Sequence, residues 1–253
     1  MEALELILVG GWAFVVSLVG GLVGLVLGNL RLPVLVLFAS SPAAGAGANV
    51  AVSGAAAVAS ASTHARAGRV NWRLFGWMAP ASLVGAIAGG VFSGVIPDRV
   101  LLVAIGVIIL YGAWEVYRYE RPAAADPEAG PRRADLWNAA GIGLGIGLLG
   151  GFVGLILGSM RLPAMVKWVG IGPYAAVGTN AAVGVVVGIG GLVGHLPSGI
   201  DWDLLAVGAA GGVPGAYLGA QLTGRLDEHL LLRAMAAILV ISGLALLVQA
   251  AVE

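Results

Sequence analysis

The chain of 253 residues contains the same segment twice, half a chain length apart. Residues 20–33 read GGLVGLVLGNLRLP, and residues 150–163 read GGFVGLILGSMRLP. The correspondence continues downstream, where Gly47-Ala48-Asn49 returns as Gly178-Thr179-Asn180. A shift of about 130 residues is far longer than the unit of a solenoid, which measures roughly 20–50 residues. The sequence therefore predicts a duplicated domain, and its fold has to accommodate two related halves.

The composition indicates that both halves lie in a membrane. Hydrophobic residues make up 59% of the chain and charged residues only 10%, whereas a soluble domain carries about 25% charged residues. Too few polar side chains remain to cover a soluble surface. Runs without Asp, Glu, Lys or Arg, each near or above the roughly 20 residues that cross a bilayer, cover residues 6–30, 32–65, 74–97, 136–160 and 204–224. We expect an all-α, polytopic helical protein of the plasma membrane.

Several classes of function are excluded by what the sequence lacks. There is no cysteine, so disulfides and thiolate metal sites are unavailable. The formal net charge is zero, which leaves no electrostatic footprint for nucleic acid. No acid lies deep in an apolar run, which argues against a carboxylate proton relay or sodium site. Residues 145–150 match G-x-G-x-x-G, but no strand precedes them. We expect no enzyme activity, no cofactor and no metal.

One polar segment divides the chain. Residues 118–135 hold three prolines, four arginines and four acids. We interpret residues 120–135 as a cytoplasmic linker between a first membrane repeat, residues 1–119, and a second, residues 136–253.

The charges of equivalent loops predict how the repeats are oriented. The loop at residues 64–73 carries Arg66, Arg69 and Arg73, whereas its counterpart at residues 195–203 carries no Lys or Arg and two acids. The positive-inside rule places the first loop in the cytoplasm and the second outside. Equivalent loops on opposite sides predict two inverted repeats, which need an odd number of segments each. Five per half satisfies this, if a short broken segment is counted; four plus four without inversion remains the alternative.

Each half interrupts an apolar stretch with glycine, arginine and proline, at residues 28–33 and 158–163. Unwound backbone at membrane depth is tolerated only where it is buried in protein or lines a wet cavity. Matched interruptions in two halves are the best sequence indication of a transport site. Pro33 and Pro163 suit the first turn of a new helix. We therefore expect broken or re-entrant helices, with amides after Gly28 and Gly158 pointing at the break.

An arginine two positions before each proline adds a permanent cation and a planar set of donors. Free amides together with Arg31 and Arg161 predict an anion site; the alternative is that both side chains snorkel to the headgroups. Lys167 has no counterpart in the first repeat, where Leu37 is aligned. It is either a substrate cation or an interfacial charge near Trp168.

Other polar residues also recur or lie near the breaks. Asn49 and Asn180 lie in alanine-rich stretches, where each amide either contacts a substrate oxygen or makes an interhelical hydrogen bond. His64 and His195 are candidates for proton transfer or gating, against a simpler role as interfacial caps. The full predicted substrate site comprises Arg31, Arg161, Asn49, Asn180, Thr179, Gly28, Gly158, Asn29, Ser159, Pro33 and Pro163.

In these residues the chain resembles the TauE/SafE sulfite exporter family of membrane permeases, also called the TSUP group. The resemblance lies in the order of the motifs: a glycine cluster followed by an apolar run and proline, then a Gly-Thr-Asn step at residues 178–180, then Asn71-Trp72 and Asp201-Trp202. The family often has three consecutive glycines where this chain has Val26, Leu27 and Gly28. The resemblance implies transport of sulfite, thiosulfate, small organosulfonates or related carboxylates.

We therefore expect a secondary transporter that moves a small anion across the plasma membrane by alternating access. An anion channel on the same scaffold is the alternative. The expected partners are the anionic substrate and the lipid bilayer, and the glycine ridges permit a homodimer.

Overall fold

The computed structural model describes residues 3–91, 97–119, 133–153, 156–196 and 199–252, and within these ranges all regular secondary structure is helical. The first half contains α1 (Ala3–Val23), α2 (Gly28–Phe38), α3 (Pro42–Arg66), α4 (Trp72–Val91) and α5 (Asp98–Tyr117). The second half contains α6 (Arg133–Val153), α7 (Gly158–Ala164) with the π-helix η1 (Met165–Val169), α8 (Pro173–His195), α9 (Trp202–Leu222) and α10 (Glu228–Val252). The two halves therefore present the same series of long and short elements.

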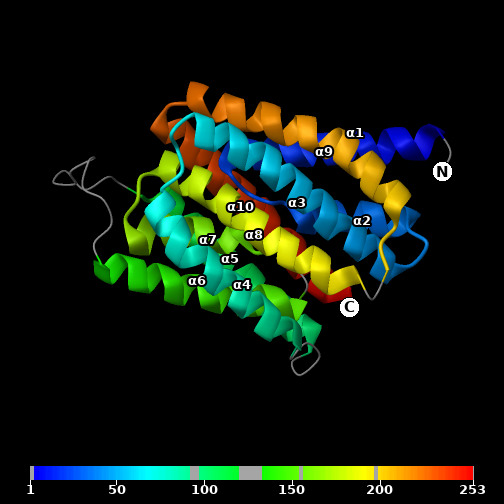
Figure 1. Ribbon diagram of the computed structural model, residues 1–253, viewed down its shortest axis with the longest axis horizontal. Coiled ribbons are helices and arrows are strands. Elements are labelled where there is room, and N and C mark those ends of the chain that lie inside the picture. Colours follow the sequence, from blue (N-terminus) through cyan, green and yellow to red (C-terminus); the bar gives the residue numbers. More distant parts are fainter. Residues whose placement is uncertain (1–2, 92–96, 120–132, 154–155, 197–198, 253) are drawn as a thin grey trace.

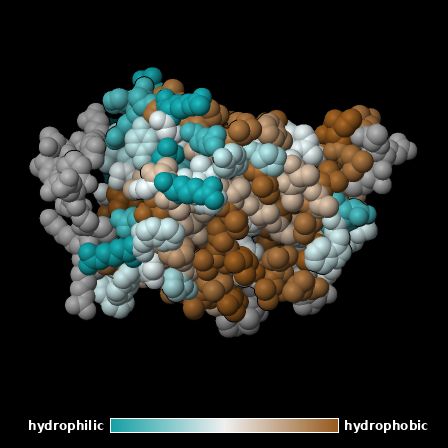
Figure 2. Space-filling view, turned by 45° about the horizontal axis from the view of Figure 1, so that its top comes forward, coloured by the Kyte–Doolittle hydropathy of each residue, from teal (hydrophilic) through white to brown (hydrophobic). Residues whose placement is uncertain are grey.

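The helices have the length and surface of membrane spans. Within the described residues, five helices are long and apolar enough to cross a bilayer: α1, α3, α5, α8 and α10. On the face shown in Figure 2, hydrophobic residues cover much of the middle of the molecule, and most of the hydrophilic residues lie toward its left end. Tryptophans near helix ends, such as Trp72, Trp114 and Trp202, are exposed, as in an interfacial belt. The prediction of a multi-pass helical membrane protein is confirmed.

The helices of the two halves pack against each other in a symmetric pattern. The first helix of each half packs against the fourth helix of the other, α1 on α9 and α6 on α4, while α3 packs on α8 and α5 on α10. Figure 1 shows that α4 runs from left to right whereas its counterpart α9 runs from right to left. The helices α3 and α8 also run in opposite directions (Figure 1). This arrangement is that of an inverted repeat.

Matched glycines allow the closest of these helix contacts. A Cβ added at Gly85 or Gly89 of α4 would overlap a carbonyl oxygen of α6, and one added at Gly215 or Gly219 of α9 would overlap a carbonyl oxygen of α1. The four carbonyls belong to Leu144, Leu148, Phe14 and Leu18, which are themselves equivalent in pairs. Small residues let helix backbones approach closely in a membrane, and here they join the two halves within one chain.

The first helix break occupies residues 24–27, between α1 and α2. Gly24 has a φ of +65°, in the left-handed region, and a Cβ there would overlap the Val177 carbonyl of α8. Both facts require glycine at this position. The break therefore lies directly against a helix of the other half. Of the second break, only Ile156 and Leu157 lie within the described part of the chain.

The helices after the breaks begin earlier than the prolines predict. Pro33 and Pro163 lie inside α2 and α7, which start at Gly28 and Gly158, so the prediction of a helix beginning at proline is wrong. An interior proline leaves one helical hydrogen bond unmade. Membrane helices tolerate this because neighbouring groups compensate. In the second half the helix also widens into the π-helix η1 shortly after Pro163.

Candidate anion site at the helix breaks

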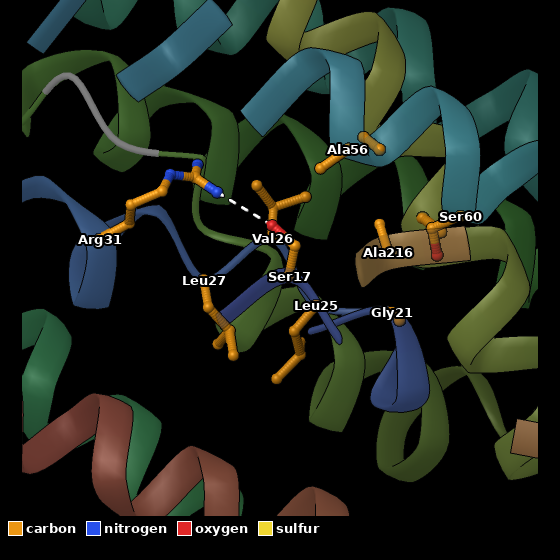
Figure 3. A pocket seen from close by; sticks show the side chains of 12 residues that line it. Ser17, Gly21, Leu25, Val26, Leu27, Arg31, Ala56, Ser60 and Ala216 are labelled. Atoms are coloured by element: carbon orange, nitrogen blue, oxygen red, sulfur yellow. Dashed lines mark hydrogen bonds between the residues drawn. The ribbon is translucent and has the colours of Figure 1, made fainter. Parts of the chain in front are cut away.

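We call the polar groups around each helix break a half-site. Arg31 lies at the centre of the first half-site, with only 2% of its surface exposed. Its Nε donates to the Asn49 Oδ1 at 3.0 Å, and its Nη1 donates to the Ser17 Oγ at 3.2 Å (Figure 3). Its Nη2 donates to the Asn49 carbonyl oxygen at 3.2 Å and also to the Ser53 Oγ. Four hydrogen bonds to neutral partners therefore engage most of the five N–H groups of this guanidinium.

Asn49 connects the arginine to the break. Its Nδ2 donates to the Gly28 carbonyl at 3.1 Å, while its Oδ1 accepts from Arg31. Ser53 lies one turn further along α3, on the same helix face. The amide of Asn49 therefore fixes the orientation of Arg31 relative to the start of α2.

The second half repeats this arrangement. Arg161 is 1% exposed, and its Nε donates to the Asn180 Oδ1 at 3.1 Å. The Asn180 Nδ2 donates to the Gly158 carbonyl at 3.1 Å and to the Gly24 carbonyl at 2.8 Å. Asn180 thus holds both its own arginine and the helix break of the other half. The Arg161 Nη2 is buried and has no hydrogen-bond partner among the described residues.

The two arginines have no buried counter-charge among the described residues. The other fully buried polar side chains there are uncharged Ser, Thr and Asn residues and His64; Asp and Glu are not among them. A buried charge in a membrane protein is costly unless it is paired or faces a polar cavity. A small anion between the halves would supply the missing negative charge.

A small cavity lies beside the first half-site (Figure 3). Its volume is about 10 Å³, close to the space of one water molecule. It is bounded by Arg31 and by small residues from both halves, including Ser17, Gly21, Ala181 and Ala216. Ser60 also lines the cavity, and its Oγ has no hydrogen-bond partner in the described ranges of the chain. The molecule is therefore closed around the site, with room for little more than water next to Arg31.

Three other residues of the predicted site, Asn29, Thr179 and Ser159, make no hydrogen bond to the arginines within the described part of the chain. The Asn29 Nδ2 donates to the Ser242 carbonyl of α10 at 3.4 Å. The Thr179 Oγ1 accepts from the Asn71 amide at 2.9 Å and thereby holds the turn between α3 and α4 against α8. Ser159 is buried in α7.

The glycines and prolines of the predicted site have structural contacts. The carbonyls of Gly28 and Gly158, rather than their amides, contact the two asparagines. The Gly158 amide donates to the Ile156 carbonyl at 2.9 Å. Pro163 lines an outer groove between α5, α6 and α7, whereas Pro33 lies within α2.

His64 is fully buried where α3 meets α1 and α9. Its Nε2 lies 3.3 Å from the Gly21 carbonyl, and its Nδ1 lies 3.4 Å from the Arg69 Nη1. Because a guanidinium only donates, Nδ1 accepts and Nε2 carries the proton, so the ring is neutral. Arg69 also donates to the Ala220 carbonyl of α9 at 3.0 Å. The side chain of His195 lies outside the described residues.

Lys167 belongs to the outer face. Its Nζ pairs with the Glu115 Oε2 at 2.6 Å, and the lysine side chain is 51% exposed. The pair lies at the outer groove, which has a volume of about 240 Å³ and is otherwise largely apolar. Of the two interpretations of Lys167, the structure favours the interfacial charge.

Sequence reasoning missed the hydroxyl groups of the first half-site. Ser53 carried a usable signal, because it follows Asn49 by four positions and so shares its helix face. Ser17 carried none, since its equivalent in the second half is glycine. The contact from Asn180 to the Gly24 carbonyl depends on packing between the halves and has no local signature.

The inverted halves, the paired breaks and the buried arginines define a polytopic membrane protein of the transporter class. The family model for the sulfite exporter TauE/SafE matches residues 9–246, and the chain therefore belongs to this family of membrane transporters. No curated protein and no solved structure matches the chain. Membership agrees with the resemblance noted in the paired motifs.

Proposed function

We propose that this protein is a secondary transporter of a small sulfur-containing anion, such as sulfite, thiosulfate or a small organosulfonate, across the plasma membrane. The main support for the proposal is that two guanidinium groups are fully buried at matched helix breaks, without a buried carboxylate among the described residues. Two cations in a membrane interior favour an anionic substrate. Membership of the sulfite exporter family favours a sulfur oxyanion among small anions.

The repeats would run over residues 1–119 and 136–253, with residues 120–135 as a cytoplasmic linker. Two equivalent turns then close opposite sides of the membrane. On the cytoplasmic side, Arg69 donates to the Ala220 carbonyl, and Thr223 donates to the Leu22 carbonyl at 2.7 Å. On the outer side, the Ser40 amide donates to the Asp201 Oδ2 at 3.1 Å, and the Asp201 amide donates to the Ala44 carbonyl at 3.2 Å.

Transport by alternating access would open these two closures in turn. One repeat would rock against the other around the breaks, because the substrate site lies where the halves meet. The positive charge at the breaks would attract the anion, and Asn49 and Asn180 would keep the guanidinium groups oriented. Contacts at both turns and a cavity of only about 10 Å³ beside Arg31 support this proposal, because a state between the two openings would have both features.

The test is sulfite counterflow in proteoliposomes containing the purified protein. Sulfate, thiosulfate and a two-carbon sulfonate serve as competitors. We expect saturable exchange that at least one competitor blocks, and its loss in a variant with alanine at Arg31 and Asn180. Absence of exchange with every anion, in protein that is shown to be folded, would contradict the proposal. Unitary currents without saturable counterflow would instead establish an anion channel.

A further inference from the structure

The two half-sites differ at the residues that can accept hydrogen bonds from the arginine. In the first half, Ser17 and Ser53 accept hydrogen bonds from Arg31. The equivalent positions in the second half are Gly147 and Gly184, shifted by 130 and 131 residues. Both hydroxyl groups are therefore missing around Arg161.

The consequence is visible at the terminal nitrogen of Arg161. The Arg31 Nη2 donates two hydrogen bonds, whereas the buried Arg161 Nη2 donates none to any residue that the structure describes. Leaving a buried charged donor unpaired is unfavourable, and a native structure that does so needs a reason.

Within the described parts of the chain, no other polar group replaces the missing hydroxyls at the Arg161 Nη2. A Cβ added at Gly147 would overlap the Ser82 carbonyl of α4, so this position is filled by a neighbouring helix. A Cβ added at Gly184 would lie 3.1 Å from the Val26 Cγ2 of the first break, an apolar contact. The second half-site is therefore closely packed at these two glycines, and the described residues provide no acceptor for the Arg161 Nη2.

We propose that the two arginines have different roles, and that the anion is bound by Arg161 through its unpaired Nη2. Arg31, whose donors are already engaged within the protein, is a structural residue that holds α1, α2 and α3 together. Asn180 is the positioning residue, since its Oδ1 fixes the Nε of Arg161 and both hydrogens of its amide are donated to backbone carbonyls. The ligand class is a small oxyanion with an oxygen that accepts a charge-assisted hydrogen bond.

This inference rests on the proposed function, and it also identifies Gly184 as a residue that determines binding. A serine there would stand where Ser53 stands in the first half, and its hydroxyl would compete with the anion for the Arg161 Nη2. The absence of a hydroxyl at this position keeps the nitrogen available.

The first experiment measures the melting temperature of the purified protein in detergent, with and without sodium sulfite at constant ionic strength. Thiosulfate and a two-carbon sulfonate are tested in parallel. A ligand that binds the folded state raises the melting temperature. We expect Arg161→Gln to melt close to the unmodified protein without anion and to lose the anion-dependent rise. We expect Arg31→Gln to melt lower without anion and to keep the rise. Arg73→Gln, at an exposed arginine of α4, is the control and should change neither.

A second pair of variants covers the case in which a variant at Arg161 does not fold. Gly184→Ser and Gly184→Ala add the same Cβ beside Val26, but only the serine adds a hydroxyl. We expect the serine variant to need at least about tenfold more sulfite for the same rise than the alanine variant, because a charge-assisted hydrogen bond is redirected within the protein.

Three results would overturn the inference. Arg161→Gln could keep the full anion-dependent rise in melting temperature, Arg31→Gln could lose this rise while melting normally, or the two Gly184 variants could respond alike to sulfite.

Failure of the proposed function is a separate result. In that case the unmodified protein would melt cooperatively, yet show no rise with any of the three anions.

Discussion

The two helix breaks present the same three groups, an arginine, an asparagine and a glycine carbonyl, in two different surroundings. Around Arg31 the protein provides hydroxyl groups, whereas around Arg161 it provides glycines. The shared groups hold the backbone of each break, because each asparagine connects its arginine to the first residue of the following helix. Both halves therefore keep the same hydrogen bonds to the backbone of the break and differ in the groups that accept hydrogen bonds from the arginine.

We expect the largest difference in stability between the half-sites when each arginine is replaced in turn. Arg31→Ala removes four hydrogen bonds and leaves Asn49, Ser17 and Ser53 without a donor in a buried site. Each buried group left unpaired costs about 1–3 kcal/mol, so we expect a loss of several kcal/mol. Arg161→Ala should cost distinctly less, since its one hydrogen bond to a described residue is that to Asn180. Thermal unfolding without anion measures both, and equal losses would contradict the difference between the half-sites.

Much of this architecture could be predicted from the sequence because it occurs twice. The paired breaks, both arginines and both asparagines were found by matching the halves, and the structure brings Arg31 to Asn49 and Arg161 to Asn180. The helical membrane fold followed from long apolar runs, which need no tertiary information.

What the sequence could not predict depends on contacts between distant segments. Matching the halves cannot find Ser17, because it pairs with a glycine in the other half. The sequence predicts that α2 begins at Pro33, whereas it begins at Gly28, a poor helix former whose stabilising contact comes from Asn49 on another helix. The sequence predicts Thr179 as a substrate ligand, and it could not predict the contact of this residue with the Asn71 amide in the turn between α3 and α4.

The matched glycine contacts offer a test of the two-fold relation itself. Gly85→Ala on α4 and Gly215→Ala on α9 each force a methyl group against a carbonyl of the partner helix. Overpacking of this kind costs about 1–3 kcal/mol, and we expect similar losses for the two variants. Gly76→Ala, also on α4, has nothing within 4 Å of the added Cβ and is the matched control. Thermal unfolding in detergent measures all three, and a loss at only one of the equivalent sites would contradict equivalent packing.

A smaller difference is expected between the two asparagines. Asn180 donates to the carbonyls of Gly24 and Gly158, whereas the Asn49 Nδ2 donates to the Gly28 carbonyl. Asn180→Ala should therefore destabilise the protein by about 1 kcal/mol more than Asn49→Ala, the net value of one hydrogen bond. The comparison uses melting curves recorded without anion. A larger loss for Asn49→Ala would show that the contact between Asn180 and the other half contributes little.

The smallest predicted effect is a difference in pH dependence between the turn at Asn71, which joins α3 and α4, and the turn at Asp201, which precedes α9. Asn71 and Asp201 are equivalent residues, and each accepts from the amide three positions later. Burial raises the pKa of Asp201, but hydrogen bonds from the amides of Ser40 and Leu204 outweigh it and hold the pKa below its ordinary value. A carboxyl group with a lowered pKa in the folded state contributes stability above its unfolded pKa of about 3.9, and this contribution is lost as the pH falls through the folded value.

Acid should therefore loosen the turn at Asp201 and leave the turn at Asn71 unchanged, because an asparagine does not titrate. Hydrogen exchange at residues 199–204, compared with residues 68–74 between pH 6 and about pH 3, measures the difference between the turns. Asp201→Asn, which makes the two turns alike, should abolish the pH dependence of protection at the turn that contains residue 201. If protection falls equally at both turns with acid, or if Asp201→Asn retains the response, then the carboxylate is not what holds this turn closed.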